Sequence, residues 1–222
     1  MKHVLLYYSN GTKPASLRKP ILERFKTRAN YRGWPIVSVG DKRVAGIEKH
    51  IKFVSDGLPM EESIFGKLVV GLSWIKRNIG EDVRVFLCDD DVIHPDRHYL
   101  QCPDVEALAY NLNFVYASKI GVFETCNRAS LTNGGLSGPV NVLLDACQSK
   151  LANFDGCWEP TQGATNYRSD VPCIDLRGPW NNTWKCDVVD GQPIATNQPA
   201  AWTNERNPLV DWALEVVNGV KC

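Results

Sequence analysis

The sequence predicts an α/β protein with a single, mostly parallel sheet flanked by helices. Over the first 100 residues, short apolar segments typical of buried strands alternate with longer segments whose apolar residues recur at helical spacing. This alternation is typical of strand–helix–strand units around a parallel sheet. At 222 residues the chain suits one domain with its own core. We therefore expect a single domain over residues 1–222, with a regular half at 1–100 and a more irregular half at 101–222.

The first four expected elements are a strand, a helix, a second strand and a second helix. Residues 3–8 form an apolar run that stops at a turn signal, which is typical of a buried strand. Residues 16–28 have helical spacing with basic residues on the other face, and residues 34–39 indicate another strand. Residues 61–79 are the clearest helix, because their apolar side chains share one face and Gly80 follows where a helix would end.

The later elements are shorter. Residues 83–88 are an almost wholly apolar strand, and residues 113–117 and 121–124 indicate two more strands. Residues 138–151 indicate a helix with Pro139 in its first turn, where proline is tolerated. Beyond residue 152 the sequence is rich in Trp, Pro, Asn and Gly, and we expect only a short helix near residues 208–217.

Three adjacent aspartates, Asp89, Asp90 and Asp91, follow directly on the strand expected at 83–88. Ligands of open α/β sheets bind beyond the carboxyl ends of the strands, so these side chains are expected at a binding site. Clustered carboxylates repel one another unless a cation compensates them, and their oxygens suit Mg²⁺ or Mn²⁺. Asp89 and Asp91 would point the same way from an extended backbone, one toward a metal and one toward a ribose hydroxyl. A solvated acidic turn, or caps for a following helix, is the alternative.

Composition and charge exclude several classes of protein. Hydrophobic residues make up 44% and charged residues 23%, which excludes a disordered chain. No segment approaches the roughly 18 apolar residues of a membrane helix, and the first residues lack a signal-peptide pattern, so we expect a cytoplasmic protein with no membrane partner. The 8 cysteines show no C-x-x-C spacing, which argues against a zinc site and for reduced thiols.

The net charge is zero, yet the N-terminal quarter is strongly basic. Residues 1–52 hold 12 Lys and Arg against 3 Asp and Glu, a local charge of +9. This excess suits an anionic ligand such as a diphosphate or a nucleic-acid backbone, and a solvated basic face is the equal alternative. A neutral total is unusual for a dedicated DNA-binding protein.

Several segments together resemble a family of small bacterial and viral glycosyltransferases with a nucleotide-sugar-binding fold of the GT-A type. The segments that carry the resemblance occur in the family's order: residues 6–10, 35–40, 63–72, 85–98, 110–113, 159–160 and 172–177, followed by Asn181 and Thr183. Two departures concern the metal. Asp89 stands where the family usually has a longer acid, and Gly178 follows Arg177 where the family tends to carry a histidine.

The resemblance implies a nucleotide-sugar site in residues 1–100 and an acceptor side in residues 101–222. The residues expected at the donor are Tyr8, Ser9, Asn10, Ser63, Lys67, Asp89, Asp90 and Arg177. The residues expected at a Mn²⁺ or Mg²⁺ ion are Asp91, Asp89 and His98, with His94 as an alternative to His98. Solvated helix positions for Ser63 and Lys67, and a plain turn at Ser9, are the structural alternatives.

The C-terminal half supplies the candidates for acceptor chemistry. Inverting sugar transfer needs a base for the acceptor hydroxyl. Glu159 and Asp155 are the candidates, and Asp145 is a further alternative. Arg177 would recognise a diphosphate by forked hydrogen bonds, or Asp175 and Arg177 would form a structural ion pair. Asn181, Thr183 and Trp180 are placed on the acceptor side, where tryptophan would stack on a sugar or pack in a core.

The sequence therefore favours a glycosyltransferase that uses a nucleotide-sugar donor and an acceptor hydroxyl. A hydroxymethylated pyrimidine in viral DNA, a polysaccharide and a small molecule all stay open as acceptors. A nucleotidyltransferase or other nucleotide-sugar-processing enzyme would use the same aspartates. A non-catalytic nucleotide-sugar-binding module is the third hypothesis, because Gly178 replaces a family histidine.

Overall fold

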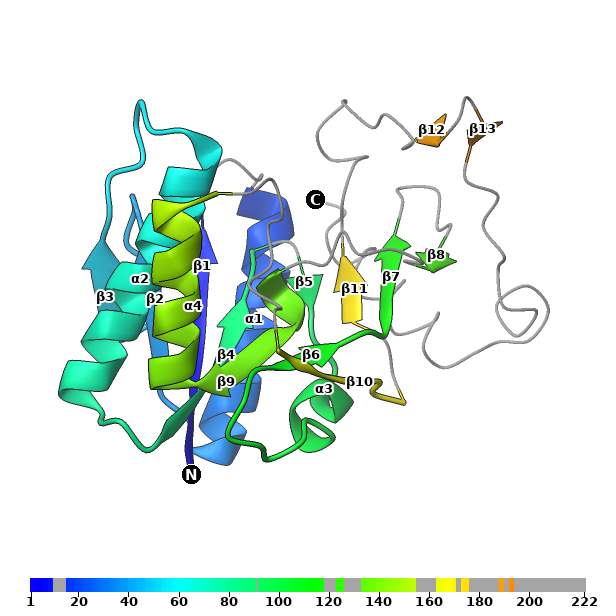
Figure 1. Ribbon diagram of the computed structural model, residues 1–222, viewed down its shortest axis with the longest axis horizontal. Coiled ribbons are helices and arrows are strands. Elements are labelled where there is room, and N and C mark those ends of the chain that lie inside the picture. Colours follow the sequence, from blue (N-terminus) through cyan, green and yellow to red (C-terminus); the bar gives the residue numbers. More distant parts are fainter. Residues whose placement is uncertain are drawn as a thin grey trace.

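The structure is a computed structural model, and it describes nine segments of the chain: residues 1–9, 15–90, 92–117, 123–125, 133–154, 163–170, 173–175, 188–189 and 192–193. A seven-stranded sheet forms the centre, in the order β10-β6-β9-β4-β1-β2-β3 (Figure 1). Its strands, in chain order, are β1 (Lys2–Ser9), β2 (Ile36–Gly40), β3 (Lys49–Lys52), β4 (Val83–Cys88), β6 (Ala109–Asn111), β9 (Leu136–Pro139) and β10 (Thr165–Tyr167).

The sheet is parallel except at one inserted strand. β3, β2, β1 and β4 pair in parallel, and β10 is parallel to β6. β9 lies between β4 and β6 and runs antiparallel to both. This mixed, mostly parallel sheet flanked by helices confirms the predicted α/β fold class. It draws strands from both the 1–100 half and the 101–222 half of the chain.

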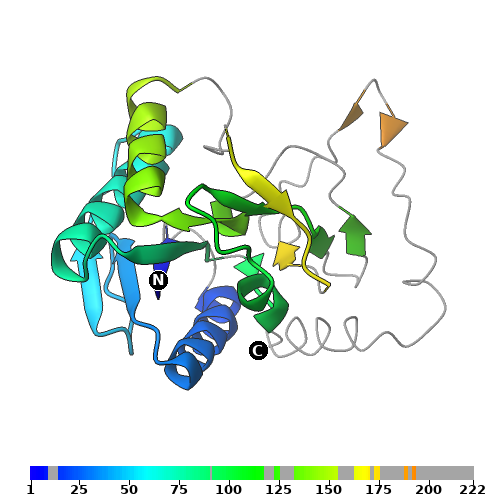
Figure 2. The same ribbon diagram turned by 60° about the horizontal axis from the view of Figure 1, so that its bottom comes forward.

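Four helices cover the two faces of the sheet. α2 (Met60–Asn78) and α4 (Val140–Ala152) lie on one face, and α1 (Ala15–Arg32) and the short α3 (Asp96–Leu100) lie on the other (Figures 1 and 2). Because strand side chains alternate between faces, Leu6 of β1 packs under α2, whereas Leu5 packs under α1. The two buried clusters therefore share β1 and β4 as their common wall.

Two smaller sheets lie beside the central sheet in the described ranges. A four-stranded sheet has the order β5-β11-β7-β8, and a separate pair is formed by two short strands. These elements are β5 (Val92–Ile93), β7 (Phe114–Ala117), β8 (Phe123–Thr125), β11 (Cys173–Asp175), β12 (Val188–Val189) and β13 (Gln192–Pro193), with a 3-10 turn at η1 (Asn133–Gly135). None of the helices in the described ranges is both long and apolar enough to cross a membrane.

The structure contains short elements that the sequence did not predict, among them β3 and β9, and at β9 it replaces part of an expected helix. Gly138 and Pro139, expected in the first turn of a helix, are the last residues of β9, and α4 begins at the next residue. A Cβ on Gly138 would lie 2.7 Å from Leu108 Cδ2, so a larger residue would crowd this strand against its neighbour. The helix expected near residues 208–217 lies outside the described residues.

Candidate functional site

The candidate site lies where two adjacent parallel strands end together. The register that pairs Tyr7 of β1 with Cys88 of β4 brings the next residues of both strands to the same edge of the sheet. Tyr8 Oη donates a hydrogen bond to Asp89 Oδ2 over 3.0 Å. Ser9 Oγ donates to Asp90 Oδ2, a second bond between the same two strand ends. The structure thus brings together four of the residues predicted at the donor.

Two further predicted donor residues come from α2. Lys67 Nζ donates to Ser63 Oγ over 2.8 Å, one helical turn apart, and both side chains are buried. Burial lowers the pKa of Lys67, while the carboxylates of Asp41, Asp90 and Asp89 oppose this shift. The ammonium group of Lys67 therefore lies within the electrostatic field of the acids at the strand ends.

A third strand contributes an acid that the sequence analysis did not include. Asp41 directly follows β2, just as Asp89 follows β4. Its Oδ1 accepts a hydrogen bond from the backbone N–H of Ser55 over 2.7 Å, and its Oδ2 accepts from Ser55 Oγ over 3.1 Å. The sequence did mark Asp41, because it directly follows an apolar strand, and the same pattern singled out Asp89, Asp90 and Asp91.

The turn after β4 carries two adjacent carboxylates, Asp89 and Asp90. Asp89 Oδ1 accepts the backbone N–H of Asp90 over 2.8 Å, which fixes the turn after β4. Carboxylate oxygens of this kind suit Mg²⁺ and Mn²⁺, which also bind phosphate oxygens. Within the described ranges, no group of three or more His, Cys, Asp or Glu side chains is placed to hold a metal ion. Asp91, the third acid of the cluster, lies outside those ranges.

The C-terminal segment meets the acidic strand end through the backbone. β11 pairs antiparallel with β5, and the register places Asp175 opposite Val92 and Ile174 opposite Ile93. Because Val92 comes directly after the aspartates in the chain, residue 175 lies beside the segment that carries them. The backbone of one predicted acceptor-side residue is therefore close to the predicted metal motif.

His98, a predicted metal ligand, lies in a buried neutral environment on α3. Its Nδ1 accepts a hydrogen bond from Asn111 Nδ2 over 3.2 Å, and Tyr167 Oη lies 3.1 Å from the same atom. Its ring packs against Phe86 and against His94, with 4.8 Å between the two imidazole centres. Burial, with a smaller contribution from His94, lowers the pKa of His98 well below its ordinary value. These contacts stabilise a neutral imidazole, and a metal-binding role for His98 stays a prediction.

Asn111, which the sequence analysis did not single out, connects this region. Its amide donates to His98 and, over 2.8 Å, to Ser169 Oγ, while its Oδ1 accepts the backbone N–H of Asn113 over 2.9 Å. The side chain is fully buried. No local sequence pattern marks Asn111, because its hydrogen-bond partners are up to 62 residues away along the chain.

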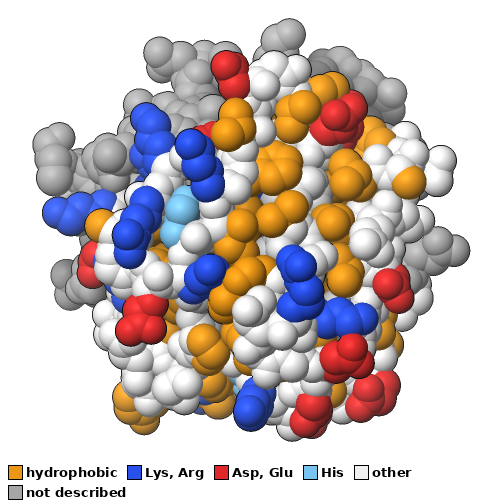
Figure 3. Space-filling model, turned by 90° about the vertical axis from the view of Figure 1, so that its left-hand side faces the viewer, with side chains coloured by type: hydrophobic (Ala, Val, Ile, Leu, Met, Phe, Trp, Pro, Cys, Tyr) orange, Lys and Arg blue, Asp and Glu red, His pale blue; other side chains and the backbone are white. Residues whose placement is uncertain are grey.

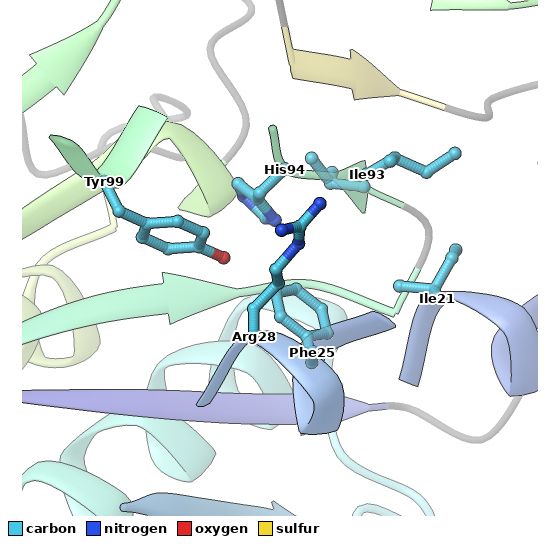
Figure 4. A pocket seen from close by; sticks show the side chains of 7 residues that line it. Ile21, Phe25, Arg28, Ile93, His94 and Tyr99 are labelled. Carbon is cyan, nitrogen blue, oxygen red and sulfur yellow. The ribbon is translucent and has the colours of Figure 1, made fainter. Parts of the chain in front are cut away.

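A small pocket lies on the α1 side of the sheet, behind β5 (Figure 4). Its wall is formed by side chains from α1, β5, residue 94 and α3: Ile21, Phe25, Arg28, Val92, Ile93, His94 and Tyr99. Arg28 is held at its edge by an ion pair with Asp96 at 2.6 Å. The lining is largely apolar, so this pocket lacks the convergent polar groups of the strand-end site.

Several predicted site residues cannot be placed by the structure. Asn10, Asp91, Asp155, Glu159, Arg177, Trp180, Asn181 and Thr183 lie outside the described residues, and Asp175 is described by its backbone alone. Their assignments to the donor, the metal, the base and the acceptor stay predictions.

Comparison with known proteins finds similarity among solved structures alone. No protein-family model matches the sequence, and no curated protein matches it. One solved structure that is similar to the chain is a glycosyltransferase involved in the glycosylation of the major capsid of PBCV-1. The match covers 79% of this chain and 93% of that chain, with 7% sequence identity and a TM-score of 0.48. A similarity this distant leaves the function to be decided by the chemistry of the site.

Proposed function

We propose that the protein is a glycosyltransferase that moves a sugar from a nucleotide-sugar donor to an acceptor hydroxyl. The observation that carries this proposal is the convergence of Tyr8, Ser9, Asp89 and Asp90 at the carboxyl ends of β1 and β4, with Lys67 beside them. At the sheet edge where ligands of α/β sheets bind, a carboxylate can accept a hydrogen bond from a ribose hydroxyl and a hydroxyl can donate one to a phosphate oxygen.

In this reaction the bond between the anomeric carbon and the diphosphate oxygen breaks, and a bond to the acceptor oxygen forms. The strand-end hydroxyls and carboxylates would orient the nucleotide, and Glu159 or Asp155 would accept the proton of the acceptor hydroxyl in an inverting reaction. Asp91 and Asp89 would hold Mn²⁺ or Mg²⁺, which supplies positive charge to the oxygens of the departing diphosphate. Arg177 would contact the same diphosphate by its forked donors.

Exposed basic side chains of the protein indicate which acceptors to test. Lys and Arg side chains gather around a histidine on the face that exposes the β3 edge (Figure 3). Lys42, Arg43 and Lys52, near the carboxyl ends of β2 and β3, are exposed bases of the N-terminal quarter. Other bases are already paired, since Arg28 and Arg32 both bind Asp96. An anionic polymer such as hydroxymethylated DNA is one acceptor class to test, beside polysaccharides and small molecules.

The test measures the binding of UDP-, GDP- and CDP-sugars to the protein, each with and without Mn²⁺. Binding is detected by thermal shift and by calorimetry. We expect one donor to stabilise the wild-type protein in the presence of the metal, because ligand binding to the native state raises its stability. Asp91→Asn should remove this effect. Asp82→Asn is the matched control, because this exposed acid lies at the opposite end of β4.

The products separate the alternatives. Release of a nucleoside diphosphate together with a glycosylated acceptor supports the proposal, whereas release of pyrophosphate identifies a nucleotidyltransferase. Donor binding with neither hydrolysis nor transfer, in assays that include hydroxymethylated DNA and polysaccharide acceptors, identifies a binding module. If no nucleotide sugar stabilises the protein under any condition, the proposal is wrong.

A further inference from the structure

Two buried polar atoms at the small pocket behind β5 have no hydrogen-bond partner among the described residues. They are Nδ1 of His94 and Oη of Tyr99, and both residues line the pocket. His94 is 3% exposed and Tyr99 is 5% exposed, so bulk water solvates neither side chain. Buried polar groups of native proteins pair with other protein groups or with ordered water in the great majority of cases. These two atoms therefore require a partner that the described residues do not supply.

The hydrogen bond of the other ring nitrogen decides what Nδ1 of His94 can do. Nε2 lies 2.6 Å from the carbonyl oxygen of Gly134, and a carbonyl oxygen can only accept, so Nε2 carries the ring proton. Burial keeps the ring neutral, because it lowers the pKa of His94 to about 4. In a neutral imidazole the second nitrogen is then a bare acceptor. A molecule that pairs with Nδ1 must donate a hydrogen bond to it.

The hydroxyl of Tyr99 can both donate and accept a hydrogen bond. Figure 4 shows it pointing into the space beside the His94 ring and the Arg28 guanidinium. The thiol of Cys88, which also acts on Tyr99, is bonded in another direction, since it donates to the carbonyl oxygen of Phe86 over 3.6 Å. The hydroxyl and the His94 ring can therefore share one bound molecule.

The size and the charge of the pocket restrict that molecule. The volume of the pocket is about 10 Å³, which is the space that one water molecule needs. An anion without a proton could not donate to Nδ1. A cation would meet the guanidinium of Arg28 and no carboxylate, because the described wall of the pocket contains no Asp or Glu. A neutral molecule with one heavy atom that both donates and accepts satisfies all of these conditions.

We infer that the pocket behind β5 holds one structural water molecule, which donates to Nδ1 of His94 and shares a second hydrogen bond with Oη of Tyr99. A water that bridges two protein groups is nearly as favourable in enthalpy as a direct hydrogen bond. This water joins residue 94, directly after β5, to α3. β5 itself begins directly after Asp91, so the water braces the segment that continues from the aspartates. The inference does not rest on the proposed function.

A crystal structure of the full chain and the ¹⁵N chemical shifts of its histidine rings at neutral pH test the inference. In the wild type we expect an ordered water within about 3.2 Å of both atoms, and an Nδ1 resonance of His94 typical of a hydrogen-bonded acceptor. Tyr99→Phe removes one partner of the water, so the water should lose occupancy and the Nδ1 resonance should move toward that of an unbonded nitrogen. Tyr31→Phe is the matched control, because Tyr31 lies on α1 and is 84% exposed, and it should leave both readouts unchanged.

Two results in the wild type would overturn the inference. One is an Nδ1 resonance of His94 that is typical of an unbonded nitrogen, and the other is a protein group that bonds directly to Nδ1 in place of water. Both are measured without any substitution, so the test stands even if Tyr99→Phe does not fold. A folded Tyr99→Phe protein that leaves the water and the Nδ1 resonance as in the wild type would also contradict the shared bond. No nucleotide sugar is present in these measurements, so their outcome is independent of the proposed function.

Discussion

Acid should destabilise this protein through His94, a histidine buried next to β5. The ring packs against Phe25 of α1 and Tyr99 of α3 (Figure 4). It also packs against His98 of α3. Its Nε2 donates to the carbonyl oxygen of Gly134 over 2.6 Å, whereas Nδ1 is buried with no hydrogen-bond partner among the described residues. Burial lowers the pKa of His94 to about 4, against a smaller opposing effect of the Gly134 carbonyl.

The sign and the size of the effect follow from this pKa. In the unfolded chain a histidine has a pKa of about 6.5. Between this pH and the folded pKa, the unfolded state therefore binds more protons than the folded state does. The free energy of unfolding therefore falls as the pH falls through this window. The difference between the unfolded and the folded pKa corresponds to about 3 kcal/mol, most of which is lost as the pH approaches the folded value. His98, whose pKa is also lowered by burial, acts in the same direction.

Urea-induced unfolding at about pH 7.5 and about pH 4.5 measures the loss of stability. Carboxylates also titrate in this range, so the wild type is compared with His94→Gln, which keeps an N–H donor for Gly134 but does not titrate. The wild type should lose about 2.5 kcal/mol more than the variant between these two pH values, because pH 4.5 is still slightly above the folded pKa. Equal losses in the two proteins would refute the reasoning, because the charge on His94 would then not contribute.

Two predictions concern packing and the buried polar network. Gly71→Ala should lower the free energy of unfolding by about 1–3 kcal/mol in urea titrations, because the new Cβ would lie 2.7 Å from Leu6 Cδ1 between α2 and β1. An unchanged midpoint would show that the side chain of Leu6 moves aside without cost. Asn111→Ala should cost about 2–4 kcal/mol and raise amide hydrogen exchange in β11, because it leaves several buried groups without partners. Exchange that rises uniformly over the whole chain would contradict a local role for Asn111.

Strands and helices with strong hydrophobic patterns could be predicted from the sequence. The strand expected at 83–88 is β4 to the residue, and the helix expected at 61–79 is α2 within one residue at each end. The edge strand β3 was missed, because three of its four residues are basic or histidine and the hydrophobic pattern is absent. β9 was missed because a Gly-Pro pair next to an amphipathic run resembles the start of a helix.

The candidate site was predictable only in part. Tyr8, Ser9, Asp89 and Asp90 follow apolar runs, and the ends of parallel strands meet at one edge, so their proximity could be inferred. The hydrogen bonds of His98 could not be inferred, because they depend on the distant Asn111 and Tyr167. Tertiary contacts of this kind leave no local trace in a sequence.

The inserted strand β9 also affects how the chain can be assembled during synthesis. β4 is fully buried in the finished protein, yet its neighbour on one side, β9, leaves the ribosome long after β4 does. Until then the nascent chain exposes an apolar strand edge, which is a template for pairing with other chains. This edge of β4 is therefore closed late, once residues 136–139 have been synthesised and can pair with it.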